Sequence, residues 1–134
     1  MPTLHGSLDS SHCPTIAIAV SASDRPSEFF DALIDTGFTG FVQLPVRRAR
    51  ELGLTPRAAS EIEYADGRID TVLLSWARVA LGIDAQEGFV HLQRGSSEVI
   101  VGVEFLRAFR KTFILSITPG LVLLVDSLAD LTAQ

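Results

Sequence analysis

The amino-acid sequence predicts an all-β (mainly β) fold with one or two short helices. Most apolar segments are short, rich in β-branched residues and separated by turn-forming residues at intervals that suit hairpins. Only segment 46–52 carries clear helix signals, with Pro45 before it and Gly53 after it. The chain has 134 residues and contains no linker or internal duplication, so residues 1–134 are expected to form a single domain.

Strands are expected along the whole chain. In segment 14–21, large β-branched residues alternate with smaller ones, as in a strand with one buried face. Segments 61–64 and 69–81 flank Asp66-Gly67, a pair that accepts the positive φ values of a type I′ turn, and they predict a long hairpin. A short helix is expected over 104–110. The other predicted strands are 29–34, 40–44, 88–92, 98–101, 112–117 and 121–125.

The charge balance argues against nucleic acid as a partner. The chain has 11 basic and 16 acidic residues, a net charge of −5, and no basic run longer than Arg47-Arg48. Proteins that bind nucleic acid concentrate positive charge instead, so we expect no nucleic-acid partner. A mean hydropathy of +0.32 is consistent with apolar surface left for a partner protein.

Cysteine content and the N-terminal segment bear on compartment and on metal binding. Cys13 is the only cysteine, which excludes an internal disulfide and multi-thiolate zinc sites. Residues 1–11 lack the features of a signal peptide, and no apolar run approaches the roughly 20 residues that span a bilayer, so we expect a cytoplasmic protein without a membrane span. His5, His12 and Cys13 could form a ligand set, but no second cluster completes it, and neither a metal nor a cofactor is expected.

The most informative segment is 32–40, ALIDTGFTG, in which an apolar strand leads Asp35 into a turn bounded by glycines. A carboxylate directly after such a strand starts at the edge of the core, where ionisation is costly without hydrogen-bond donors or a shared proton. Gly37 and Gly40 permit close backbone approach, and Thr36 offers a hydroxyl that can hold the loop. A plain turn between two strands is the alternative interpretation.

Three motifs in this order resemble those of the retropepsin-like aspartic proteases, in particular the small bacterial members. They read ALIDTGFTG (32–40), YADG (64–67) and IVGVEFL (100–106), so the resemblance spans about residues 29–124. It implies a small β-barrel-like domain with a flap hairpin over the active site. In such a fold the second glycine element, here Val101-Gly102, packs against the catalytic loop.

The resemblance also implies roles for individual residues. Asp35 is the implied catalytic acid, Thr36 donates its hydroxyl across a dimer to the opposing loop, and Gly37 offers its carbonyl to substrate. The other implied substrate-binding residues are Phe38, Thr39, Gly40, Asp66 and Gly67, the last two at or near the flap tip, where a plain hairpin turn is the alternative.

The chemistry implied by this family requires two carboxylates. Hydrolysis of a peptide bond without a metal or a covalent intermediate needs one carboxylate to activate water and a second, protonated one to polarise the carbonyl. The chain contains one Asp-Thr-Gly motif, so the resemblance implies a homodimer with Asp35 of each subunit at the two-fold axis.

The sequence departs from the viral members of this family at three positions. Those members carry an acidic residue two places after the motif glycine and an arginine after the second glycine, where this chain has Thr39 and Val103. Both halves of that ion pair are absent together, which leaves the contacts that lock the dimer undefined. Phe38 replaces a small residue, so the wall that faces the substrate is expected to be narrower.

Two further sets of residues are weaker candidates for a catalytic or ligand-binding site. Ser96-Ser97 follow His91 closely, but no nucleophile elbow surrounds them, and a loop is the better interpretation. Tyr64 and Trp76 are expected to be packing residues, with ligand contact as the alternative.

The predicted function is that of an aspartic endopeptidase that hydrolyses a peptide or protein substrate with one Asp35 per subunit of a homodimer. The first alternative is a non-catalytic module that keeps the fold and binds an extended peptide by strand addition. The second is a domain whose function is dimerisation. The intact Asp35-Thr36-Gly37 triplet favours the enzyme, because a binding module needs no paired acid at its centre.

Overall fold

A computed structural model describes residues 3–95 and 97–126, and these residues form a mainly β structure with 52% strand and 10% helix. This confirms the predicted mainly β class and the two short helices. The strands are β1 (Leu4–His5), β2 (Ser7–Leu8), β3 (Pro14–Ser21), β4 (Glu28–Ile34), β5 (Val42–Pro45), β6 (Ala58–Glu63), β7 (Ile69–Leu81), β8 (Asp84–Gln93), β9 (Ile100–Val101), β10 (Thr112–Ser116) and β11 (Leu121–Val125). The helices are α1 (Val46–Glu51) and α2 (Val103–Ala108).

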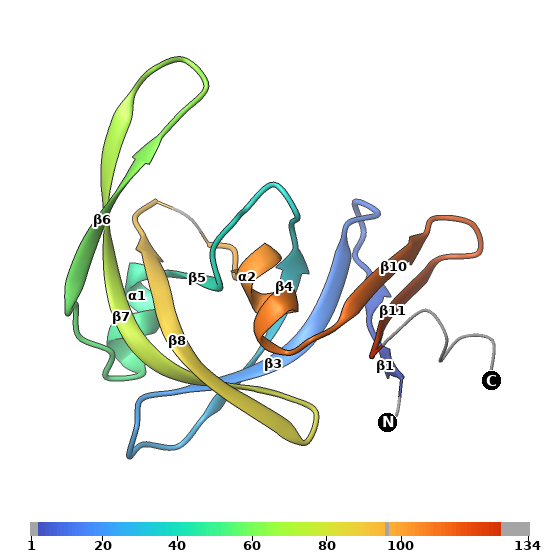
Figure 1. Ribbon diagram of the computed structural model, residues 1–134. Coiled ribbons are helices and arrows are strands. Elements are labelled where there is room, and N and C mark those ends of the chain that lie inside the picture. Colours follow the sequence, from blue (N-terminus) through green and yellow to red (C-terminus); the bar gives the residue numbers. More distant parts are fainter. Residues whose placement is uncertain (1–2, 96, 127–134) are drawn as a thin grey trace.

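Eight strands form a mixed sheet in the order β2-β3-β4-β9-β5-β8-β7-β6 (Figure 1). β3 also pairs with β7, with Val20 opposite Val79, so that β3, β4, β9, β5, β8 and β7 close a ring of hydrogen-bonded strands. The β4–β9 and β5–β8 pairs are parallel. A second sheet, β1-β11-β10, lies beside this ring.

One cluster of apolar side chains forms the core, and most of its members come from alternate positions of the ring strands. Val42, Val90 and Val101 are completely buried, on three neighbouring strands. α2 joins this cluster through Phe105 and Phe109, whose ring centroids lie 4.8 Å apart. Burial of each such side chain is worth roughly 1.5–3 kcal/mol, so packing against the sheet stabilises a helix too short to form alone.

The boundaries of the predicted strands differ from the observed ones where pairing decides them. Segments 14–21, 69–81 and 121–125 are confirmed residue for residue. β8 extends the predicted 88–92 back to Asp84, because β7 continues to pair with it as far as Leu81 opposite Asp84. β1 and β2 were not predicted. They are two-residue strands that exist through their pairing with β11 and β3.

The turn at the tip of the β6–β7 hairpin is not the predicted type I′ turn. Only Gly67 has a positive φ, of +87°, and its N–H donates to the carbonyl of Tyr64 at 2.9 Å. This geometry is that of a type I turn followed by a left-handed glycine, which is another common hairpin connection. The Asp66 side chain accepts hydrogen bonds from the backbone N–H of Arg68 at 3.0 Å and from its Nε at 2.9 Å.

The helix signals in α1 are confirmed, although the helix ends at Glu51 instead of 52. Gly53 has φ +79° and donates to the Arg50 carbonyl at 3.0 Å, while Leu54 donates to the Ala49 carbonyl at 3.0 Å. These two bonds form a Schellman motif, which explains why the sequence places a glycine there. α2 spans 103–108 instead of 104–110, because Arg110 adopts a positive φ of +55° that ends the helix.

Candidate active site

The loop 35–41 lies between β4 and β5, and the short strand β9 separates these two strands in the sheet. β9 runs parallel to β4, with Ile34 opposite Val101, and antiparallel to β5, with Val42 opposite Val101. The chain therefore leaves β4, crosses over the end of β9 and returns along β5. The Asp35 N–H donates to the Val101 carbonyl at 3.0 Å, which holds the start of the loop on β9.

Asp35 is exposed at the point where the buried strand β4 ends. Its Oδ1 accepts a hydrogen bond from the Gly37 N–H at 2.8 Å, and its carbonyl accepts one from the Phe38 N–H at 3.1 Å. These bonds turn the chain tightly and orient the carboxylate. A Cβ atom on Gly37 would lie 3.1 Å from that Oδ1, so glycine keeps the space beside the acid open. The predicted apolar strand leading to Asp35 is confirmed, whereas the acid, expected at the edge of the core, is exposed.

The second glycine element packs against this loop, as the resemblance of its motifs implied. A Cβ atom on Gly102 would lie 2.2 Å from the carbonyl oxygen of Phe38 and 2.6 Å from that of Gly40, so only glycine fits. The next two N–H groups bind the same carbonyls, Val103 to Phe38 at 2.9 Å and Glu104 to Gly40 at 3.2 Å. The first two N–H groups of α2, which lack partners within the helix, are therefore satisfied by the loop.

The structure does not bring all the predicted site residues together within one chain. Thr36 and Thr39 are exposed in the same loop as Asp35. Asp66 and Gly67 are instead at the tip of the long β6–β7 hairpin, which projects on the same side of the molecule as the β4–β5 loop and stands apart from it (Figure 1). Nothing lies within 4 Å of the Cβ position of Gly67, so the tip is free of contacts with the body there.

A cavity of about 420 Å³ borders the loop at Thr39 and Gly40. Its walls include Trp76 and Phe89, each 42% exposed, whose rings meet edge to face at 4.9 Å between centroids. Sequence reasoning left Trp76 as a packing residue and missed Phe89. The two residues lie opposite each other on β7 and β8, and this can be recognised from the sequence only once the register of the two strands is known.

His91 lines the same cavity, although the sequence analysis assigned it to neither a metal site nor a Ser–His pair. Its ring meets Phe38 edge to face at 5.1 Å, and its Nε2 lies 2.9 Å from the Cβ position of Gly40. Burial lowers the pKa of His91, because the charged imidazolium would lose its hydration. Ser97 lines a different cavity, which His91 does not border, and Ser96 lies outside the described residues.

The described part of the chain holds neither a cluster of metal-binding side chains nor a helix that could span a membrane. Within residues 3–95 and 97–126 no group of three or more His, Cys, Asp or Glu side chains is placed to hold a metal ion. Cys13 is exposed, and its thiol contacts the Ser11 carbonyl at 3.9 Å. No described helix has the length and apolar character needed to cross a membrane.

Comparison with known proteins adds no relative: no protein-family model matches the chain, and no curated protein shows significant similarity to it.

Proposed function

We propose that this chain is one subunit of a homodimeric aspartic endopeptidase with a retropepsin-like barrel. The observation that carries the proposal is the support of the Asp35 loop by β9 and Gly102. A surface turn needs no such support, whereas a catalytic acid must be held in a defined position. Here the loop 35–41 is joined to segment 101–104 by hydrogen bonds from the backbone N–H groups of Asp35, Gly102, Val103 and Glu104.

In this proposal two copies of the Asp35 loop meet at a two-fold axis and share one proton. The ionised carboxylate takes a proton from water as the water oxygen adds to the scissile carbonyl carbon. The protonated carboxyl of the other subunit gives its proton to the carbonyl oxygen. The first carboxyl then gives its proton to the amide nitrogen while the second, now ionised, takes a proton from a hydroxyl of the diol, so that the C–N bond breaks and leaves a carboxylic acid and an amine.

The neighbouring residues have supporting roles in the proposal. Thr36 holds the opposing loop and Gly37 presents its carbonyl to the substrate. Phe38, Thr39 and Gly40 form the wall beside the acid, and the Asp66-Gly67 tip closes over the bound peptide and excludes water.

The experiment compares Asp35→Asn with a matched control, Asp31→Asn, which changes an exposed aspartate on the strand that leads to Asp35. On a peptide library, Asp35→Asn should lower kcat by about 10²- to 10⁴-fold, because general acid–base catalysis supplies that range. Asp31→Asn should retain wild-type turnover. Turnover by the unmodified protein should follow a bell-shaped pH profile in the acidic to neutral range, because the pair works with one proton.

Two further readouts separate the enzyme from its alternatives. Sedimentation should detect a symmetric dimer, and inhibitors whose hydroxyl mimics the tetrahedral intermediate should block cleavage. Wild-type turnover by Asp35→Asn would rule out the mechanism. Peptide binding by a strictly monomeric protein without any cleavage would support the non-catalytic binding module instead.

A further inference from the structure

Four arginines surround one open cavity at the end of β5, in a chain whose net charge is −5. The cavity has a volume of about 600 Å³, and its lining includes Arg47, Arg48, Arg50 and Arg94, together with the polar side chains of Gln93 and Ser97. None of the described residues that line it is acidic. Four of the 11 basic residues of the chain therefore share a single concave surface.

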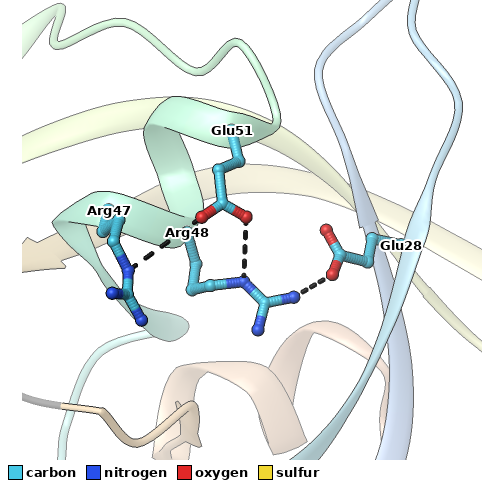
Figure 2. A network of polar contacts seen from close by, with 4 residues as sticks. All are labelled: Glu28, Arg47, Arg48 and Glu51. Atoms are coloured by element: carbon cyan, nitrogen blue, oxygen red, sulfur yellow. Dashed lines mark hydrogen bonds and ion pairs between the residues drawn. The ribbon is translucent and has the colours of Figure 1, made fainter.

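Carboxylates beside the cavity hold two of these arginines in place. Arg48 contacts Glu28 and lies 3.5 Å from Glu51, and Arg47 reaches the same Glu51 at 4.0 Å (Figure 2). The Arg48 guanidinium also lies 5.0 Å from the centre of the Phe30 ring, an arrangement that favours the cation. These contacts orient the two side chains from α1 and partly offset their charges.

The other two arginines have no such partner. Arg50 and Arg94 are exposed, and neither guanidinium forms an ion pair or hydrogen bond with any residue that the structure describes. They also border a second cavity of about 600 Å³, which continues the first toward the stem of the β6–β7 hairpin at Thr71 and has one carboxylate, that of Asp70, in its lining. Two adjoining cavities make the surface elongated, which suits an extended chain better than a single small anion.

We propose that this arginine-lined surface binds an acidic segment of a polypeptide. A planar guanidinium donates two parallel hydrogen bonds to a carboxylate, which makes arginine the suitable residue for such recognition. The proposal rests on the proposed function in one respect, that the polypeptide is the substrate. β5 separates the surface from the Asp35 loop by four residues, or about 13 Å at roughly 3.3 Å per residue. The acidic residues would then lie about four to six positions from the cleaved bond.

The test measures binding without cleavage, with the full chain carrying Asp35→Asn. A fluorescein-labelled peptide with four consecutive aspartates is titrated and compared with its asparagine counterpart by fluorescence anisotropy. We expect at least tenfold tighter binding of the aspartate peptide, and a marked loss of that preference as salt screens the charges. Arg50→Gln combined with Arg94→Gln should abolish the preference, and the fold should persist because neither side chain has a partner.

The matched control is Arg78→Gln, an exposed arginine on β7 outside both cavities, which should leave the preference unchanged. Equal affinity for the two peptides, or an unchanged preference in the double variant, overturns the proposal. Full displacement by inorganic phosphate at concentrations comparable to the peptide also overturns it, in favour of a phosphate site.

A final comparison keeps this inference separate from the proposed function. In the chain with Asp35 intact, acidic residues four to six positions from the cleaved bond should lower KM and leave kcat unchanged. If the acidic peptide binds but nothing is cleaved, the surface stands and the endopeptidase proposal fails. If neutral and acidic substrates are cleaved with the same KM and kcat, this inference fails and the endopeptidase proposal stands.

Discussion

The carbonyl oxygen of Phe38 lies 2.2 Å from the position that a Cβ atom on Gly102 would occupy, and it accepts a hydrogen bond from the next N–H group, that of Val103, at 2.9 Å. The candidate catalytic loop and the strand β9 are therefore joined at a point that tolerates no side chain. This contact explains why a glycine far along the sequence matters to the geometry around Asp35.

Replacement of Gly102 by Ala should destabilise the protein by about 2–4 kcal/mol, because the new methyl group must push the Phe38 and Gly40 carbonyls away. Urea unfolding measures the effect. Gly67→Ala is the control, since its Cβ meets nothing within 4 Å and only its positive φ is penalised, at about 1–2 kcal/mol. Equal losses in the two variants would contradict the close contact under the loop.

Replacement of Gly67 by Val should penalise the left-handed residue at the hairpin tip by about 1–2 kcal/mol. Because the tip has no contacts with the body at this position, the loss in global unfolding should not exceed this local penalty. Under the proposed function, turnover should fall more than dimerisation does, since the tip closes over the substrate. An unchanged kcat/KM would argue against a role of the tip in catalysis.

Hydrogen exchange tests the mobility of the same tip. The amides of residues 65–69 should exchange much faster than those of 29–34, which pair with β3 as far as Leu33 and with β9 at Leu33 and Ile34. A long hairpin without a covering layer opens readily. Equal protection of the two segments would show that the tip belongs to the stable core.

Lys111 is 3% exposed at its side chain and pairs with Asp126, which is 30% exposed. Asp126→Asn should destabilise the protein by about 2–4 kcal/mol, because it leaves a buried ammonium group without its counter-ion. Lys111→Met, which removes the buried charge and keeps the apolar length, should cost less. Thermal unfolding of both variants shows which one is destabilised more. A larger loss in Lys111→Met than in Asp126→Asn would mean that the ion pair itself is strongly stabilising.

Burial lowers the pKa of His91, so the folded protein resists protonation of this imidazole more than the unfolded chain does. The stabilisation is present above the unfolded pKa of about 6.5 and is lost as the pH falls below it, because the unfolded state then gains protons. Urea unfolding at pH 7.5 and pH 5.5 should show this loss, and His91→Gln should reduce it. An identical pH dependence in the variant would assign the loss to other groups.

Local sequence patterns were sufficient for much of the fold. Alternation in segment 14–21 predicted β3, and the glycine at 53 predicted the end of α1 to within one residue, because each depends on interactions between residues close in sequence. β1, β2 and the first part of β8 were missed. Their extents depend on distant partners, and two-residue strands have no periodicity to detect.

The sequence by itself determined that Asp35 follows an apolar strand and enters a glycine-bounded turn, and the resemblance of its motifs to a known family implied that Gly102 packs against that turn. Only the tertiary structure decided that β9 lies between β4 and β5, and that Trp76 and Phe89 meet in a cavity beside the loop. The tertiary structure also brings four arginines, three from α1 and one that follows β8, around one cavity. The physical reason is that turn chemistry acts between neighbours in the chain, whereas strand order and cavities arise from how distant apolar surfaces pack.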